Sequence, residues 1–328
     1  MIELYNLVEE AYQRISPVIN KTPVLTSRSL NYQFNAAVYC KCENFQRMGA
    51  FKFRGAYNAL SLLSPEEQKQ GVITHSSGNH AQALALAAKE LGIEATIVMP
   101  KDAPEVKKQA TAAYGGKIIF SESDIDARAK MTQELINQYG YVLIHPYNYL
   151  PTIAGAGTVA YELIKEIDNL DYLLTPVGGG GLLSGSVLAA KGLSNNIKVI
   201  GVEPEQANDA YLSFINRRIF PSVNPNTIAD GLRTSLGKIT FKIIRTHVDN
   251  IITVSEEQII EAMRFIWERM KIIVEPSGAV PLAGLRELVK TTSLDRKRIG
   301  LIFSGGNIDL TDFFMLLKQK FLKEGNIS

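Results

Sequence analysis

The sequence has few of the residues that mark a secreted, membrane-spanning or nucleic-acid-binding protein. It contains two cysteines in 328 residues, and its net charge of +2 comes from 35 basic and 33 acidic residues. These charges are spread along the chain, so no basic arm or acidic tail suggests a nucleic-acid or membrane partner. No apolar stretch reaches the roughly 20 uninterrupted residues of a membrane span. Any anion that binds must therefore be met by a local site.

The two cysteines, Cys40 and Cys42, stand two positions apart in an expected strand. Side chains alternate along a strand, so both thiols should point to one face, which is a poor geometry for a disulfide. No histidine or further cysteine lies close to them in sequence. The pattern therefore favours a plain strand over a zinc site or a redox pair.

The first residues, Met1 to Arg14, place Glu3, Glu9 and Glu10 among apolar positions. This predicts an amphipathic helix and lacks the basic-then-apolar order of a signal peptide. With 46% hydrophobic residues, the chain is long enough for two lobes that each bury a core. We expect a soluble protein of the cytoplasm.

From residue 71 onward, short β-branched runs alternate with amphipathic segments of helix length. This alternation predicts parallel βαβ units, and hence an α/β fold with helices on both faces of open sheets. A break near Pro146–Pro151 predicts a small domain at residues 65–147 and a large domain built from residues 1–64 and 148–328. The last part of the chain should contain helices at Ser255–Met270 and Leu310–Leu322.

Four consecutive glycines, Gly178, Gly179, Gly180 and Gly181, stand between a buried-strand pattern and a helical pattern. Bare backbone N–H groups can converge on an anion at such a turn, and the helix N-terminus adds a partial positive charge. Neither the dinucleotide-binding glycine spacing nor the P-loop lysine is present. The sequence therefore predicts a phosphate cradle, with a flexible turn as the plainer alternative.

A second feature is the lysine between two aromatic residues in Phe51-Lys52-Phe53. Phenyl rings beside an ammonium disfavour its charged form, so the pKa of Lys52 should fall toward a range where a neutral amine attacks an aldehyde. The plainer alternative is a lysine whose stem passes a core strand and whose charge reaches water.

Two further motifs follow expected strands and combine serine, glycine and asparagine. The first is Ser76-Ser77-Gly78-Asn79-His80, and the second is Ser304-Gly305-Gly306-Asn307. A serine that caps a helix would explain the serines alone. It does not explain several polar side chains together at the carboxyl end of a parallel strand, where α/β proteins bind ligands.

Together these motifs resemble the serine/threonine dehydratase and serine racemase family of pyridoxal-phosphate enzymes. They occur in the family's order, and the similarity extends from Thr22-Pro23 to Asn307. The resemblance implies an α/β architecture with two open-sheet lobes, the tryptophan-synthase-β-like fold called fold-type II. A protein that keeps this fold but only binds a ligand is the rival outside the enzyme class.

The resemblance also implies a role for each cofactor residue. Lys52 would hold pyridoxal phosphate as a Schiff base, and Gly178–Gly181 would hold its phosphate. Asn79 would hydrogen-bond the ring hydroxyl, Phe51 would pack on the ring, and Ser304 would meet the pyridine nitrogen. A hydroxyl at that nitrogen moderates the electron sink, which suits elimination better than transamination.

On the substrate side, the resemblance places Ser76, Ser77, Asn79 and His80 around the substrate carboxylate, and Thr234 near the cofactor. The implied reaction converts L-serine, L-threonine or threo-3-hydroxyaspartate to a keto acid and ammonia, after the catalytic lysine removes the Cα proton. Ser77 matches a position where racemases carry a second acid or base. A serine racemase with elimination as a side reaction is therefore the alternative.

A metal site and a homodimer also come from the resemblance. The carboxylates of Glu203 and Asp209, with the carbonyl of Ala207, would bind Mg²⁺ or Ca²⁺, because all-oxygen ligands suit a hard cation. A solvated acidic loop is the alternative.

The chain departs from the family in two places. Arg47-Met48 replaces the Lys-Thr pair of nucleotide-activated racemases, although Gln82, Lys107 and Tyr114 still match the nucleotide site. Activation by ATP is therefore in doubt. The chain also ends about twenty residues after Asn307, so we expect no regulatory domain and no feedback inhibition.

Overall fold

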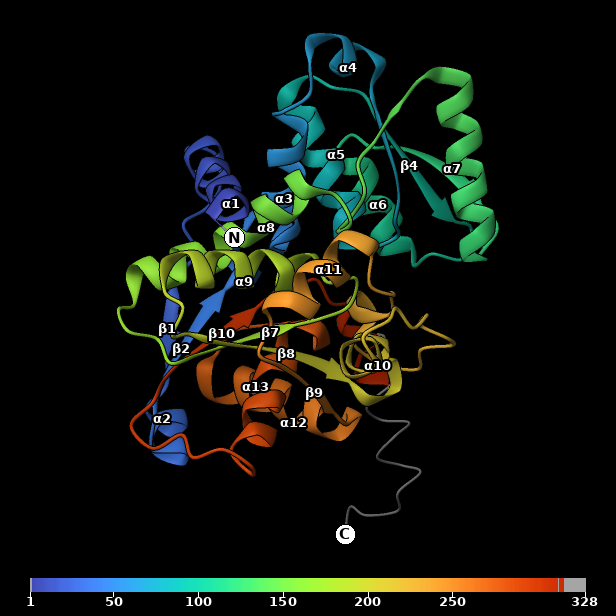
Figure 1. The fold of residues 1–328 in the computed structure, drawn as a ribbon. Coiled ribbons are helices and arrows are strands. Elements are labelled where there is room, and N and C mark those ends of the chain that lie inside the picture. The colour runs from blue at the N-terminus through green and yellow to red at the C-terminus, as the bar shows by residue number, and fades with distance from the viewer. Residues whose placement is uncertain (1, 312, 316–328) are drawn as a thin grey trace.

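The computed structural model describes residues 2–311 and 313–315, in two lobes that each surround one sheet (Figure 1). The larger sheet has the strand order β1-β2-β10-β7-β8-β9. Neighbouring strands are parallel except β1, which pairs antiparallel with β2. The strands are β1 (Val24–Thr26), β2 (Ala37–Cys42), β7 (Tyr172–Pro176), β8 (Lys198–Pro204), β9 (Asn250–Val254) and β10 (Arg298–Phe303).

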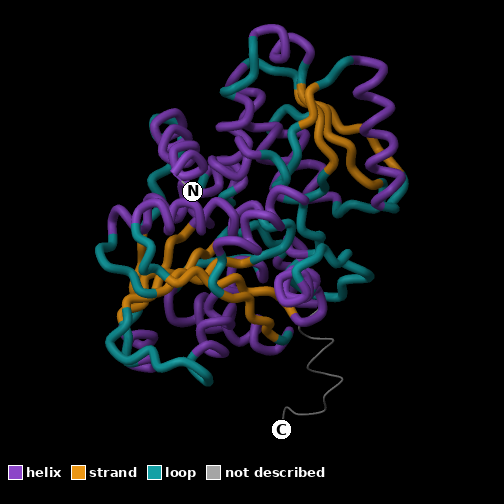
Figure 2. Tube along the Cα trace, viewed as in Figure 1, coloured by secondary structure: helices purple, strands orange, loops and turns teal. Residues whose placement is uncertain are grey.

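Helices cover both faces of this sheet, as Figure 2 shows, and each face has its own apolar core. On one face are α1 (Ile2–Ile15), α8 (Leu150–Glu166), α9 (Gly181–Leu193) and α11 (Lys238–His247). On the other are α2 (Arg28–Phe34), α12 (Glu256–Phe265) and α13 (Pro276–Leu288). The α/β architecture with two open sheets is confirmed.

The smaller sheet is parallel throughout and has the order β5-β4-β3-β6. Its core is formed with α3 (Lys52–Leu60) and α5 (Asn79–Leu91), and α7 (Ile125–Tyr139) packs against its strands. Its strands are β3 (Val72–His75), β4 (Ala95–Pro100), β5 (Lys117–Ser121) and β6 (Val142–Leu143), and α4 (Pro65–Gln70) and α6 (Glu105–Ala113) complete the lobe. A domain division near residues 65 and 147 remains a proposal.

Several elements differ from the sequence-based expectation. The expected helix Ser255–Met270 is α12 followed by a π-helical turn, η5 (Ile266–Met270). Most of the helix expected at Leu310–Leu322 lies outside the described residues. Strand β9 and helix α11 were not expected at all. The short elements are η1 (Glu43–Phe45), η2 (Arg47–Gly49), η3 (Glu205–Ala207), α10 (Asp209–Asn216) and η4 (Asp230–Leu232).

Both cysteines lie in β2 and are buried as free thiols in the same apolar cluster. The expectation that they share one face of a strand is therefore confirmed. Within the residues that the structure describes, no helix is long and apolar enough to cross a membrane.

Candidate active site

Lys52 is the first residue of α3 and lies between the two lobes of the chain. Its Nζ donates to the carbonyl of Pro146 at 3.0 Å and lies 5.1 Å from the centre of the Phe51 ring. Burial lowers the pKa of Lys52 to about 8, although the carboxylate of Glu275 raises it. About a tenth of this amine is therefore neutral at pH 7, and the neutral form is the one that attacks an aldehyde.

The expected pair of flanking rings is only half right. Phe53 is fully buried in the core, where its ring lies 5.6 Å from that of Tyr57. The reason is the helix that begins at Lys52, because successive helical residues are about 100° apart around the axis. Phe53 therefore turns away from the ammonium, and general burial rather than two phenyl rings lowers the lysine pKa.

The four glycines form a buried turn between β7 and α9. Gly180 has φ of 85° and stands at the N-cap of α9. A Cβ on Gly178 would lie 2.8 Å from the backbone of Leu232, and a Cβ on Gly179 would lie 2.4 Å from the Tyr147 ring. Side chains are therefore excluded by close packing, and the flexible-turn alternative is wrong.

The backbone N–H groups of this turn are available to a ligand. In the described part of the chain, no backbone carbonyl accepts a hydrogen bond from Gly178–Gly181. Helix α9 begins here, so its first N–H groups have no partner within the helix and its dipole favours an anion. These features fit a phosphate group.

Asn79, the first residue of α5, has its side-chain amide engaged on both sides. Its Nδ2 donates to both carboxylate oxygens of Glu275, at 2.9 and 3.1 Å, and its Oδ1 accepts from Asn307 Nδ2 at 2.9 Å. Burial raises the pKa of Glu275 to about 8, and the charge of Asp230 adds to this rise. Residues from two of the motifs thus meet with Glu275 in one hydrogen-bonded row.

The motif after β10 lies directly beside the lysine motif. Phe51 N donates to the Ser304 carbonyl at 3.0 Å, and Ala50 forms a β-bridge with Gly305. Ser304 is 3% exposed. No described helix starts within this motif. The capped-helix alternative is therefore wrong here.

The serine motif after β3 is also not a helix cap. Gly78 is the N-cap of α5, and no side chain accepts a capping hydrogen bond there. Ser76 and Ser77 are half-buried, and the Ser76 hydroxyl accepts from Gly78 N at 3.3 Å. Thr234, in contrast, is exposed on a loop after η4.

Three of the four histidines gather around the lysine. Burial lowers the pKa of His80 well below its usual range and that of His145 to about 4, and the charge of Lys52 contributes to both. The His75 and His145 rings meet edge to face at 6.1 Å. These imidazoles are therefore neutral near pH 7. Only His80 was singled out from the sequence.

A buried group of charges, which we call the charge cluster, lies behind α3 and comprises Lys41, Glu43, Arg54 and Glu162. Arg54 donates two hydrogen bonds to each carboxylate, at 2.8 to 2.9 Å. Lys41 Nζ lies 2.7 Å from Glu162 Oε2, and all four side chains are at most 2% exposed. The cluster fixes the helix that carries Lys52, and sequence reasoning missed it.

The two carboxylates of the expected metal site lie side by side in the larger lobe. Glu203 accepts from the N–H groups of Ala210 and Tyr211, and burial with the charge of Asp209 raises its pKa well above the usual range. Burial raises the pKa of Asp209 to about 7, although nearby N–H and O–H groups lower it. These groups do not meet hydrogen-bonding geometry, so within the described residues neither Asp209 oxygen has a well-placed donor.

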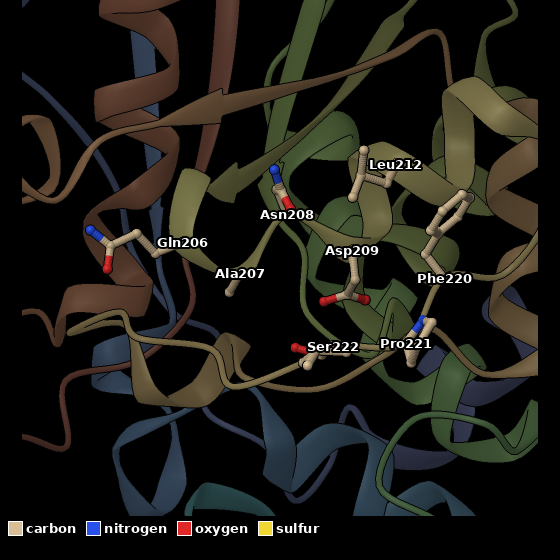
Figure 3. Close-up of a pocket in the computed structure, with 9 residues that line it drawn as sticks. Gln206, Ala207, Asn208, Asp209, Leu212, Phe220, Pro221 and Ser222 are labelled. Atoms are coloured by element: carbon tan, nitrogen blue, oxygen red, sulfur yellow. The ribbon is translucent and has the colours of Figure 1, made fainter.

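A cavity of about 310 Å³ opens beside Asp209 (Figure 3). It is lined by Ala207, Asp209 and Ser222, among others. The buried Asp209 carboxylate has no hydrogen-bond partner in the part of the chain that the structure describes. Together with the neighbouring Glu203 carboxylate and a backbone carbonyl, it fits a hard cation. Among the described residues, however, no group of three His, Cys, Asp or Glu side chains converges, so carbonyls or water would have to complete the shell.

Comparison with known proteins gives a consistent result along nearly the whole chain. The family model described as "Pyridoxal-phosphate dependent enzyme" matches residues 15–305. The L-threo-3-hydroxyaspartate ammonia-lyase of Saccharomyces cerevisiae is 50% identical, covering 98% of each chain. The serine racemase of Schizosaccharomyces pombe is also 50% identical, covering 97% of this chain and 98% of the relative.

Solved structures agree with the sequence relatives. The crystal structure of serine racemase from Dictyostelium discoideum superposes with a TM-score of 0.89 at 46% identity. The matched region covers 93% of this chain and 99% of that one. Both lobes and their arrangement are therefore shared.

Proposed function

The chain belongs to the family of pyridoxal-phosphate-dependent enzymes, and on this premise we propose that it dehydrates a small β-hydroxy amino acid by β-elimination, after which hydrolysis of the product releases ammonia. The proposed substrates are L-serine, L-threonine and threo-3-hydroxyaspartate, and the products are a keto acid and ammonia. The observation that carries the proposal is the half-buried amine of Lys52, whose Nζ lies beside the Phe51 ring and whose pKa is lowered to about 8. A half-identical relative named as a threo-3-hydroxyaspartate ammonia-lyase supports the substrate class.

The residues around Lys52 fit pyridoxal phosphate. Gly178–Gly181 offer free N–H groups for its phosphate, and the Phe51 ring offers an apolar face for its ring. Asn79 would bind the ring hydroxyl and Ser304 the ring nitrogen. When bound, the cofactor supplies the electron sink that makes a substrate Cα proton acidic.

Lys52 is the proposed base at the substrate Cα. Its neutral amine takes the proton at Nζ, and the ammonium that results has the Pro146 carbonyl within hydrogen-bonding distance.

The proposed carboxylate site includes Ser76, Ser77, Asn79 and His80 at and before the start of α5, together with Thr234 on the loop after η4. The neutral ring of His80 donates its Nε2–H to the Ile144 carbonyl at 3.2 Å, so its Nδ1 is an acceptor. His80 would therefore line this site without donating a hydrogen bond to the carboxylate.

Serine racemase is the second candidate function, because a half-identical relative carries that name. In this reaction a second group must return a proton to Cα. Ser77 is the proposed group, and the share of racemisation then depends on how readily its hydroxyl gives a proton.

A spectroscopic experiment tests the cofactor proposal. The purified protein should absorb near the violet edge of the visible range, and Lys52→Ala should abolish this band. Lys21→Ala is the matched control, because Lys21 is 72% exposed. A wild-type protein that never takes up pyridoxal phosphate would rule out the catalytic proposal.

A product assay separates the lyase from the racemase. With L-serine as substrate, pyruvate and D-serine are followed together, and a panel of β-hydroxy amino acids is then compared for keto-acid release. Ser77→Ala should lose D-serine output, while the control Ser293→Ala, at an exposed loop position outside the proposed site, should keep it. Full D-serine output from Ser77→Ala would exclude Ser77 as the second acid.

Three further properties belong to the proposal. Glu203, Asp209 and the Ala207 carbonyl bind Mg²⁺ or Ca²⁺, which would neutralise two buried carboxylates. The enzyme works as a homodimer, as its resemblance to the family suggests. It resides in the cytoplasm, where the buried thiols of Cys40 and Cys42 would stay reduced.

A further inference from the structure

The turn after β6, residues 144–148, supplies the only backbone group that hydrogen-bonds the Lys52 amine in the described residues. That group is the carbonyl of Pro146, at 3.0 Å from Nζ. A carbonyl has no charge of its own, so its effect on an ammonium depends on being held at the right place and angle.

The side chain of His145 holds this turn from within. Its Nδ1 accepts from the backbone N–H of Asn148 at 3.0 Å and from that of Tyr147 at 3.3 Å. A nitrogen that accepts two N–H groups carries no proton, so the neutral imidazole has its proton on Nε2. In the sequence, Pro146 stands between His145 and the two residues whose N–H groups His145 accepts, so these hydrogen bonds close the turn around its carbonyl.

Neighbouring groups fix the same turn from outside. His80 Nε2 lies 3.2 Å from the Ile144 carbonyl, and the Thr152 hydroxyl donates to the His145 carbonyl at 3.3 Å. The Asn148 side chain accepts from Ile239 N at 2.8 Å, which ties the turn to the larger lobe. The turn is thus anchored to both lobes.

The geometry points to His145 as a positioning residue, which holds the Pro146 carbonyl as the acceptor for protonated Lys52. This inference rests on the proposed function, in which Lys52 carries a proton taken from the substrate. His145 acts through the backbone and need not touch substrate or cofactor. The residue stays neutral at working pH because burial lowers its pKa to about 4.

The charge state of Lys52 responds to several facing groups. Glu275, at the N-cap of α13, raises its pKa, while burial lowers it. The imidazoles of His80 and His145 face it as neutral rings. Because His145 is neutral at pH 6 and above, replacing it changes none of the charges near Lys52. A change in nearby charge therefore does not contribute to a shift in the lysine pKa, and His145→Asn serves as the control for the lost ring.

The test measures the pKa of Lys52 in the full chain after pyridoxal phosphate has been removed. Acetic anhydride labels neutral amines, and peptide mass spectrometry gives the labelling of Lys52 relative to exposed Lys21 at each pH. The variants are His145→Asn, whose Oδ1 can accept the same two N–H groups, and His145→Gln, whose amide is one methylene too far.

We expect wild type and His145→Asn to share one Lys52 pKa. In His145→Gln the Lys52 pKa should fall by about one unit, because the ammonium loses a charge-assisted hydrogen bond. Lys52 would then be labelled about tenfold faster at pH 6. If His145→Gln does not fold, as judged by circular dichroism, His145→Ala takes its place.

Two results would overturn the inference. One is an unchanged Lys52 pKa in His145→Gln, and the other is an equal fall in His145→Asn, which would mean that the ring and not its acceptor matters. The cofactor-loaded protein supplies a separate control, since bound pyridoxal phosphate should protect Lys52 from labelling. Failure of that protection counts against the proposed function and leaves the role of His145 intact.

Discussion

Replacing Arg54 by methionine should strongly destabilise the chain without touching any residue proposed to contact the substrate or cofactor. Arg54 donates four hydrogen bonds to the carboxylates of Glu43 and Glu162 and one, at 3.3 Å, to the Thr158 hydroxyl. The charge cluster holds two cations and two anions, so the wild-type sum is zero. Methionine fills much of the space but leaves one uncompensated negative charge in the interior.

The expected cost is large because burial prevents water from taking over the lost partners. Removing one member of a buried ion pair costs about 3–5 kcal/mol, against about 5–15 kcal/mol for the whole stability of a typical domain. Arg54→Met with Glu43→Gln restores the zero sum, since Lys41 still faces Glu162 at 2.7 Å. The double variant should therefore lose at least about 1 kcal/mol less than the sum of the single changes.

Urea unfolding followed by circular dichroism measures these differences. The matched control is Arg264→Met, which breaks a surface pair with Glu268 whose side chains are 74% and 55% exposed. Exposed pairs contribute about 0–1 kcal/mol, so this control should unfold almost as the wild type does. A loss below about 1 kcal/mol in Arg54→Met, or strict additivity in the double variant, would refute the argument from buried charge.

Three further predictions follow from other parts of the structure. Since the pKa of His145 falls from 6.5 to about 4 on folding, the unfolded chain binds more protons between these values, and stability declines as pH falls through that window. At pH 4.5 the free energy of unfolding of His145→Asn should exceed that of the wild type by about 2 kcal/mol, because this pH-dependent loss is absent. Urea unfolding at several pH values measures the difference, and an unchanged pH slope in the variant would contradict the prediction. Gly179→Ala should weaken pyridoxal-phosphate binding at least about tenfold in a fluorescence titration, because its Cβ meets the Tyr147 ring at 2.4 Å. Adding Tyr147→Ala should restore binding, and failure to do so would show that the clash is not the cause. Ca²⁺ should raise the melting temperature of the wild type but not that of Asp209→Asn. If a chelator does not lower the melting temperature of the wild type, the segment is a plain acidic loop and not a metal site.

The sheets were predictable because parallel strands buried on both faces have a simple pattern. Runs such as 72–75 and 172–176 are short, mostly buried, and followed within two residues by serine or glycine. The edge strand β9 gave a weaker signal, and the spacing of Ile239, Ile243 and Ile244 in α11 was not recognised as one apolar face.

The motifs of the site were predictable because each lies within a few residues of sequence. Their contacts were not, because folding joins distant segments. Lys52 and Pro146 are 94 positions apart, and Arg54 and Glu162 are 108 apart. Side-chain direction was a second obstacle, since the start of α3 at Lys52 decides which phenylalanine faces the amine.

Burial shifts the pKa values of Lys52 and Glu275 in opposite directions, and each shift favours the uncharged form of its group. It lowers the pKa of Lys52 to about 8 and raises that of Glu275 to about 8. Near pH 7 the carboxyl of Glu275 is therefore largely protonated, and the histidines around it are neutral. An anionic phosphate or substrate carboxylate thus meets free N–H groups and one ammonium, with little opposing negative charge. A site arranged in this way favours amino acids over amines that lack a carboxylate.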